Sequence, residues 1–463
     1  MPTKHSIIVV TREAELREAR LLATGIKDAG RTCCVMVSRT HFASAFSSGT
    51  TVIDIVGRNV SVRPTVIDLG NKESSHGRLA DFKVWAKSAV PIIGFLKGVR
   101  LWISLYRQRK IVLTTLRKLK PCAIFLFDER TPDINMPILA EAVVLGIRTI
   151  LVPYAMAAVQ AREYVRLREP DCHISGIRLH FISKYLPKHL HEASDGSKLI
   201  FYPFWETLAV AWHGYRKCSP WVFGAGLSNI LSVFGEYDRR AAEQEGVPYQ
   251  KIRVTSQPSM DEVFAIFSNR DTNRRSIAAK YGLNPLAPII VCAVPHQAEE
   301  NLLDQSTHSS QTKSLFDVLH NQGFRHGAGV LLSLHPKSRI ENYKQLAEAA
   351  GLVIVTEPLS QILPSADVMV GTLSSTIRWA AAMGIPAFVI DTLNRGYTIF
   401  KHLHSVQIVF TANALDQLMT KYFEDANVRK SLQATARDSA SLVTPLDGKA
   451  CERLMNLAIA EEM

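Results

Sequence analysis

Short, unbroken runs of apolar residues alternate with helical patterns along the chain, and this alternation constrains the fold more than any other feature. Residues 7–11, 32–37 and 123–127 are such runs, and residues 13–29 carry apolar and charged side chains at helical spacing. Unbroken apolar runs are typical of strands buried on both faces, as in a parallel sheet that helices cover on both sides. The first half of the chain is therefore predicted to be α/β, with a doubly wound parallel sheet.

The same pattern returns in the second half of the chain. Five short apolar runs, separated by helical patterns such as residues 340–350 and 376–383, are predicted strands: residues 288–294, 330–334, 353–356, 368–370 and 387–390. With 463 residues, the chain also exceeds the size at which one hydrophobic core usually keeps growing. We therefore predict two Rossmann-like domains, residues 1–256 and 257–463, which face each other across a cleft, with further helices near the C-terminal end.

The composition is that of an ordinary folded protein, with 47% hydrophobic and 21% charged residues. The seven cysteines include no C-x-x-C pair, which favours neither a zinc ribbon nor a disulfide framework. No window of about eighteen uncharged apolar residues and no signal-peptide pattern is found, so neither a spanning helix nor secretion is expected. A cytoplasmic protein is the expectation.

The formal net charge of +12 predicts attraction to polyanions. Much of the excess lies in residues 82–120, where ten Lys and Arg residues and no acidic residue are interleaved with aromatic and aliphatic side chains. This pattern indicates a basic amphipathic segment that could lie on an anionic inner-membrane surface, which would make the protein peripheral. A pair of surface helices with solvated basic faces is the alternative. No nucleic-acid module accompanies the charge, so nucleic acid is not an expected partner.

Polar residues follow two of the predicted strands in the second half. His335, Pro336 and Lys337 come directly after residues 330–334, and a His and a Lys at a strand's carboxyl end can neutralise a pyrophosphate leaving group. The alternative for His335 is a hydrogen bond to a loop carbonyl.

The hydroxyl residues Ser374, Ser375 and Thr376 lie between a predicted strand and a predicted helix. Hydroxyls and free backbone N–H groups at a helix start suit a phosphate, whereas ordinary N-capping is the alternative. Glu357 ends another predicted strand, where it is interpreted either as a ligand of ribose hydroxyls or as a solvated loop acid.

These motifs carry a family resemblance. Residues 329–397 resemble the nucleotide-binding half of bacterial GT-B enzymes, particularly capsule and lipopolysaccharide glycosyltransferases that use CMP-activated sialic acid or Kdo. Those enzymes pair a His-Pro motif with a Ser-Ser or Ser-Thr motif, which His335-Pro336 and Ser374-Ser375 resemble. The segment is also similar to UDP-N-acetylglucosamine 2-epimerases, which share the fold. The resemblance implies that the His and the hydroxyls hold the donor phosphate, and that His296 lies in a phosphate-contacting loop.

An acidic pair follows the predicted strand 123–127. Asp128 and Glu129 resemble the family's acidic motif, in which two acids precede a Gly and one is the general base, but Arg130 stands where the family has Gly. A carboxylate at a strand end needs only hydrogen-bond reach to activate an acceptor hydroxyl. The base is therefore open between Asp128 and Glu129, and an acid at a helix start paired with Arg130 is the alternative.

Together these features predict a metal-independent glycosyltransferase that moves a sugar from a CMP- or UDP-sugar to a cell-surface glycan or a lipid-linked acceptor, with the nucleotide sugar as substrate and no cofactor. One alternative is a non-hydrolysing UDP-N-acetylglucosamine 2-epimerase, which needs acids to remove and return a proton on the sugar. The other is a non-catalytic polysaccharide-export or scaffold protein with a degenerate nucleotide fold.

Overall fold

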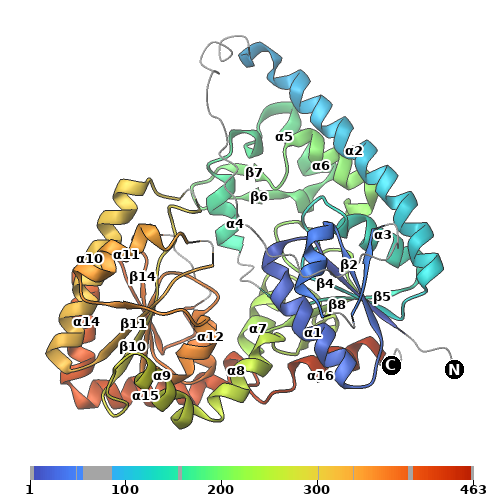
Figure 1. Ribbon diagram of the computed structural model, residues 1–463. Helices are drawn as coiled ribbons and strands as arrows, with labels where there is room; N and C mark the ends of the chain where they lie inside the picture. Colours follow the sequence, from blue (N-terminus) through green and yellow to red (C-terminus); the bar gives the residue numbers. More distant parts are fainter. Residues whose placement is uncertain are drawn as a thin grey trace. The chain divides into compact units, whose positions relative to one another are not determined.

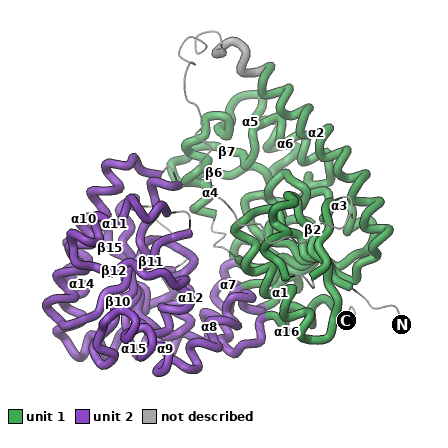
Figure 2. The backbone as a smooth tube through the Cα atoms, in the orientation of Figure 1, with its two compact units in different colours: residues 1–233, 242–253, 451–463 green, residues 234–241, 254–450 purple. Residues whose placement is uncertain are grey.

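The computed structural model describes residues 5–47, 50–55, 86–154, 159–300, 302–336, 338–394 and 400–459, with the backbone alone for residues 86–91. Two compact units make up the chain (Figure 1, Figure 2). Unit 1 comprises residues 1–233, 242–253 and 451–463, and unit 2 comprises residues 234–241 and 254–450.

Unit 1 is built on a seven-stranded sheet with the order β3-β2-β1-β4-β5-β8-β9. The five strands from β3 to β5 run parallel, and their order 3-2-1-4-5 is the order of a Rossmann-type half. The strands are β1 (Ser6–Val10), β2 (Cys33–Val37), β3 (Thr51–Asp54), β4 (Ala123–Leu126), β5 (Arg148–Leu151), β8 (Ile230–Val233) and β9 (Ile252–Val254).

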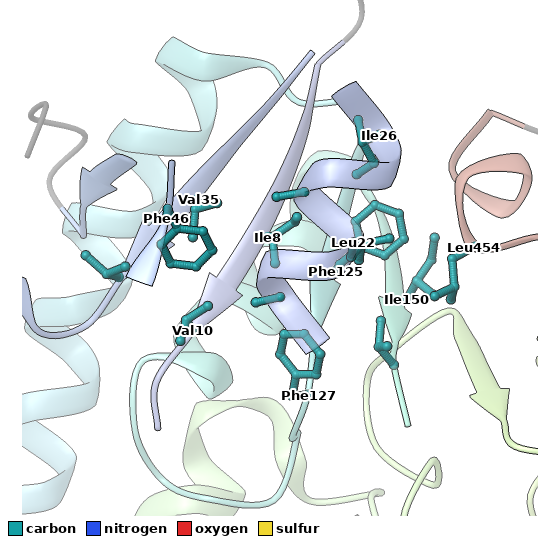
Figure 3. Close-up of a cluster of buried hydrophobic side chains, with 14 of the residues drawn as sticks. Ile8, Val10, Leu22, Ile26, Val35, Phe46, Phe125, Phe127, Ile150 and Leu454 are labelled. Carbon is teal, nitrogen blue, oxygen red and sulfur yellow. The ribbon is translucent and has the colours of Figure 1, made fainter. Parts of the chain in front are cut away.

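The core of unit 1 forms where helices α1 (Leu16–Asp28) and α16 (Ala450–Ile459) pack on this sheet. Ile8, Leu22, Phe125, Ile150 and Leu454 all have 0% exposure and contact one another in one cluster (Figure 3). Burying each of these side chains contributes roughly 1.5–3 kcal/mol. The apolar runs that predicted strands are thus the runs that form this core.

Helices and one small sheet complete unit 1. They are α2 (Ala86–Leu119), α3 (Asn135–Leu145), α4 (Val159–Arg166), α5 (Gly176–Tyr185), α6 (Phe204–Val210) and the antiparallel pair β6 (Leu190–Glu192) and β7 (Lys198–Ile200). Residues 82–85 of the basic segment lie outside the described residues, and residues 86–119 form a single helix, α2, rather than a pair, which packs against α3 and α6. A Cβ on Gly98 would lie 2.6 Å from the Cβ of Trp205, so α2 and α6 approach closely because residue 98 has no side chain.

Unit 2 has a six-stranded sheet in which every pair of neighbours is parallel. Its order is β12-β11-β10-β13-β14-β15, which is 3-2-1-4-5-6 when counted from the unit's first strand. The strands are β10 (Ile289–Ala293), β11 (Gly329–Ser333), β12 (Val353–Ile354), β13 (Val368–Gly371), β14 (Ala387–Ile390) and β15 (Val406–Val409). The prediction of an α/β protein with two Rossmann-like, doubly wound domains is confirmed.

The helices of unit 2 cover this sheet (Figure 1). Phe316 of α10 and Tyr422 of α14 are buried in its core with Ile290, Leu332 and Phe388 from the strands. The helices are α8 (Ser259–Phe267), α9 (Arg270–Lys280), α10 (Gln305–His326), α11 (Glu341–Ala349), α12 (Leu359–Ile362), α13 (Ile377–Ala382), α14 (Ala412–Glu424) and α15 (Ala426–Val443), and α7 (Glu236–Gln244) begins in this unit.

The composition of the two units differs in two places from the predicted division of the chain at residue 256. Residues 451–463 belong to unit 1, because Leu454 of α16 is buried in the core of the first sheet. Residues 234–241 belong to unit 2, where the hydroxyl of Thr444 donates a hydrogen bond of 2.7 Å to the carbonyl of Phe234. Both exchanges depend on contacts between residues about 200 or more positions apart in the chain, which local patterns do not reveal.

Within the described part of the chain, no helix combines the length and the apolar character that crossing a membrane requires.

Candidate functional site

Three sequence motifs of unit 2 lie at one edge of its sheet. Ala293 of β10 is paired in register with Ser333 of β11 and with Gly371 of β13, so all three strands end at the same level. The loops that follow them carry His296, His335 and Ser374. Because adjacent strands are about 4.8 Å apart, the motifs after β11 and β13 are separated by roughly 10 Å, with the loop after β10 between them.

The two histidines of this edge are in direct contact. The rings of His296 and His335 stack with their centroids 3.8 Å apart and their planes 5° from parallel. His296 Nε2 lies 3.1 Å from Glu300 Oε1, which orients that ring. The structure therefore brings together two histidines that the sequence placed 39 positions apart. Imidazole nitrogens are suited to contact phosphate oxygens. Pro336 is exposed in the turn after His335, and Lys337 lies outside the described residues.

The hydroxyl motif forms the turn between β13 and α13. The Oγ of Ser374 accepts hydrogen bonds from the Oγ1 of Thr376 at 3.1 Å and from its N–H at 3.4 Å. The N–H groups of Ile377 and Arg378 already donate to the carbonyls of Ser374 and Ser375. The predicted free N–H groups at this helix start are therefore occupied at these two positions. An anion at this turn would be held chiefly by the half-buried hydroxyls of residues 374–376.

Glu357 follows β12 at the same edge, but its carboxylate is engaged. It accepts hydrogen bonds from the ammonium group of Lys280 and from the hydroxyl of Tyr281. Burial raises the pKa of Glu357, and these two hydrogen bonds outweigh burial and lower that pKa to about 2. To bind ribose hydroxyls, Glu357 would have to give up one of these two partners. The alternative interpretation, a solvated loop acid, does not describe this engaged carboxylate.

In unit 1, Glu129 is a structural carboxylate. Its side chain is 2% exposed, and its Oε1 accepts the N–H groups of Gly224 and Gly226 at 2.8 and 2.9 Å. Its Oε2 accepts the hydroxyl and the N–H of Ser228 at 2.9 and 3.3 Å. Four donors thus surround the two oxygens and hold the loop that leads into β8. No position remains for a substrate hydroxyl, which argues against Glu129 as the general base.

Asp128 is held between two arginines. It accepts hydrogen bonds of 2.6 Å from Arg12 Nη2 and from Thr131 Oγ1, and Arg130 Nε lies 3.5 Å from its Oδ1. Burial raises the pKa of Asp128, but Arg130, Thr131 and Arg12 together lower it to about 2. A carboxylate with such a low pKa is a weak proton acceptor near neutral pH. The alternative interpretation of Asp128 was an acid paired with Arg130. This ion pair is present, and Arg12 forms a second one with the same carboxylate.

Two further carboxyl groups at this edge were missed in the sequence. Glu15, 1% exposed, accepts the N–H groups of Thr11 and Arg12, and burial raises its pKa to about 7. Asp133 is half-buried and accepts the N–H of Asn135 at 2.9 Å, and burial raises its pKa to about 6. Carboxyl groups with pKa values near the operating pH are candidate general bases. The one local signal for Asp133 is its position five residues after Asp128 in the same loop.

A cavity of about 940 Å³ lies at the other end of the sheet of unit 1. Its lining includes Ser6 and Arg148, the first residues of β1 and β5, together with Met455 of α16. Open parallel sheets bind ligands outside the carboxyl ends of their strands, so no ligand is assigned to this cavity. Among the residues that the structure describes, no group of three or more His, Cys, Asp and Glu side chains is placed to hold a metal ion.

No known protein family and no curated protein matches the chain by sequence. Solved structures do match it along nearly its full length. A UDP-GlcNAc 2-epimerase from Neisseria meningitidis, solved with UDP-GlcNAc bound, has a TM-score of 0.53 at 10% identity and covers 98% of this chain and 99% of its own. The calicheamicin glycosyltransferase CalG4 has a TM-score of 0.52 at 11% identity and covers 99% of this chain and 98% of its own.

The wall teichoic acid polymerase TagF has a TM-score of 0.50 at 10% identity and covers 98% of this chain and 87% of its own. These identities are low, so the likeness concerns the fold. Together with the two Rossmann-type strand orders, it shows that the chain has the two-domain GT-B fold that these epimerases and glycosyltransferases share.

Proposed function

We propose that the protein is a glycosyltransferase that moves a sugar from a CMP- or UDP-activated donor to a cell-surface glycan or glycolipid acceptor. The observation that carries the proposal is the stacked pair His296 and His335, which shares one sheet edge with the hydroxyls of residues 374–376. When the bond between the sugar carbon and the phosphate oxygen breaks, negative charge develops on the nucleotide. Preorganised donors stabilise that charge more in the transition state than in the ground state.

The proposed general base is Asp133. Glu129 has four donors on its carboxylate, and Asp128 is ion-paired to Arg12 and Arg130. Asp133, half-buried and with a pKa of about 6, is ionised at neutral pH and basic enough to take the acceptor hydroxyl proton. The acceptor oxygen then forms the new bond to the sugar while the nucleotide leaves. We propose that these side chains act without a metal ion or cofactor.

Fold similarity supports a nucleotide sugar as donor. CalG4 is a glycosyltransferase, TagF is a polymerase of wall teichoic acid, and the epimerase from Neisseria meningitidis was solved with UDP-GlcNAc. An MnaA structure from Staphylococcus aureus contains UDP and has a TM-score of 0.50 at 11% identity. Proteins of this fold thus hold nucleotides and nucleotide sugars, which is the ligand class proposed for this chain.

One observation favours the epimerase as the second candidate function. Glu15 and Asp133 are two carboxyl groups whose pKa values are raised to about 7 and about 6, as an acid and a base that exchange a proton require. Incubation with UDP-GlcNAc in deuterated water separates the two functions. Deuterium at C2 of the sugar, seen by NMR, would establish the epimerase, whereas an unchanged C2 supports the transferase.

We propose that α2 holds the protein on an anionic membrane surface. Ile92, Leu96 and Val99 are exposed on this helix beside the exposed Lys97 and Arg100. The opposite side of α2 packs against α3 and α6, so the basic and apolar side remains available to a bilayer. This placement would bring the enzyme to a lipid-linked acceptor.

A nucleotide screen tests the proposed function. Melting temperatures are measured with CMP, CDP, UDP, UMP, GDP and dTDP for the wild type, for His335→Ala and for His404→Ala, an exposed histidine of the same unit. A nucleotide at one hundred times its Kd stabilises the folded state by about 2.7 kcal/mol, which raises Tm by roughly 5–10 °C. We expect this rise in the wild type and in His404→Ala but not in His335→Ala. If no nucleotide raises Tm, the scaffold alternative replaces the proposal.

A further inference from the structure

Unit 1 contains a second cavity, of about 220 Å³, on the loop that follows β4. Three arginines line it: Arg130 from that loop, and Arg162 and Arg166 from α4. Arg162 and Arg166 are four residues apart, so they lie on one face of the helix. Phe201 and Tyr202 form an aromatic part of the wall. We call this group of residues the arginine pocket.

The positive charges of the arginine pocket are only partly neutralised from within. Asp128 is ion-paired to both Arg12 and Arg130, and Arg166 is paired with Glu169. Within the described ranges, no carboxylate forms an ion pair with Arg162. Burial and the neighbouring charges of Arg130 and Arg166 lower the pKa of Arg162, and the opposing effects of Asp128 and Tyr154 do not outweigh them.

Two of the arginines also have buried nitrogens without a hydrogen-bond acceptor in the described part of the chain. Arg130 is 5% exposed, and its Nη1 is buried without a hydrogen-bond acceptor among the described residues, while its Nε is engaged only by the 3.5 Å ion pair with Asp128 Oδ1. The Nε of Arg166 is likewise buried without a hydrogen-bond acceptor among these residues. The rest of Arg130 is fixed, since its guanidinium lies 4.9 Å from the ring centre of Phe223 and its carbonyl accepts the hydroxyl of Tyr202. Buried charged donors without acceptors are costly, and a bound anion would remove that cost.

We propose that the arginine pocket binds one oxyanion group, a phosphate or a carboxylate, on the sugar acceptor. Planar guanidinium groups match the oxygens of both groups in two-point hydrogen bonds. The cavity is smaller than the roughly 300–1,000 Å³ of pockets for drug-sized ligands, so it admits an acidic group with part of a sugar ring rather than a nucleotide. Glu206, also in the wall, would accept hydrogen bonds from the ring hydroxyls. The identification of the ligand as a sugar acceptor rests on the proposed transferase function.

The test uses the full chain and three probes: glucose 6-phosphate, glucuronate and uncharged glucose, titrated by calorimetry at constant ionic strength, because salt screens such contacts. Arg162→Gln removes the arginine that has no ion pair with any described carboxylate, and Arg20→Gln removes an exposed arginine of the same unit as the control. We expect at least one acid to bind the wild type and Arg20→Gln, and at least about tenfold weaker binding to Arg162→Gln. Glucose should not bind.

The two acids distinguish the source of the oxyanion, since preference for one identifies a phosphorylated or a carboxylated acceptor. Arg166→Gln is the second variant, and it should weaken the same acid. Equal binding to wild type and Arg162→Gln, or failure of both acids to bind, would overturn the inference. The nucleotide screen on His335→Ala separates this result from the proposed function. Nucleotide binding without acid binding leaves the transferase intact, and acid binding without nucleotide binding leaves only the pocket.

Discussion

At the carboxyl edge of the sheet in unit 1, arginines and carboxyl groups surround Asp128, whereas the same edge in unit 2 carries imidazoles and hydroxyls. In unit 1, Asp128 binds Arg12 and Arg130, and burial raises the pKa of Glu15 and Asp133 nearby. In unit 2, His296 and His335 stack at the same sheet edge as the turn that contains the serines. Both sheets have Rossmann-type strand orders. The shared fold therefore determines where a site lies, and the loop residues determine its chemistry.

The largest expected effect comes from the proposed base of unit 1. Asp133→Asn should lower sugar transfer by about 10²–10⁴-fold, because the amide cannot accept the proton. Nucleotide binding, a property proposed for unit 2, should remain. In the wild type the rate should increase as the pH rises through about 6, where Asp133 loses its proton. The measurement is release of nucleotide from the sugar donor as a function of pH.

Asp171→Asn, which changes an exposed acid of unit 1, is the control for this experiment. A normal rate in Asp133→Asn and a large loss in Asp128→Asn would move the base to Asp128, and the comparison between the two carboxylates would be reversed.

A second prediction separates structural from catalytic carboxylates in unit 1. Glu129→Ala should reduce the free energy of unfolding by roughly 3–5 kcal/mol, because four donors lose a buried charged acceptor. Urea unfolding measures the change, with the exposed Glu13→Ala as control. A loss below about 1 kcal/mol would show that the loop before β8 does not depend on Glu129.

A third prediction concerns the pH dependence of stability. Burial raises the pKa of Glu15 to about 7 in the folded state, so the folded state binds a proton more readily than the unfolded chain, whose Glu has a pKa of about 4.3. The contribution of Glu15 is therefore most favourable below pH 4 and is lost as the pH rises toward 7. Glu15→Gln should be more stable than the wild type at pH 8 by roughly 2–3 kcal/mol, and this advantage should vanish near pH 4.

Thermal or urea unfolding at several pH values checks this prediction. Asp128, at the same edge of the sheet, should affect stability with the opposite dependence on pH. The pKa of Asp128 is lowered to about 2, so its contribution to stability is present above pH 4 and is lost as the pH falls toward 2. A stability difference between Glu15→Gln and wild type that did not change with pH would show that Glu15 is ionised in the folded protein.

The smallest expected effect concerns the basic side chains of α2. It tests whether positive charge of unit 1 outside the candidate site binds an anionic membrane. Lys97→Gln and Arg100→Gln on α2 should each weaken binding to vesicles of phosphatidylglycerol by about fivefold, since each basic side chain near an anionic bilayer contributes about 1 kcal/mol. Lys27→Gln, an exposed lysine of the same unit, should have little effect. Flotation with these vesicles and with phosphatidylcholine vesicles provides the measurement. Equal flotation with both lipids would contradict an electrostatic role for α2.

Much of the fold could be predicted from local patterns. The strands β1, β4, β10 and β13 lie in runs that are apolar on both faces, and the helices between them have clear periodicity. The short pair β6 and β7 was missed, because strands of three residues have too few side chains to show a pattern. The His-Pro and Ser-Ser motifs were found because each directly follows a strand, and His296 was found in the same way, but its stacking on His335 was not predicted. Arg12, Glu15 and Arg162 show no local signal in the sequence.

The sequence by itself determined that this protein has two parallel sheets and that polar residues collect at the carboxyl ends of their strands, because apolar periodicity and strand ends are local properties. Only the tertiary structure decided that Glu129 holds a loop while Asp133 has a pKa near 6, and that His296 stacks on His335. It also decided that α16 belongs to unit 1. These properties depend on desolvation and on contacts between distant residues, which exist only after the chain has folded.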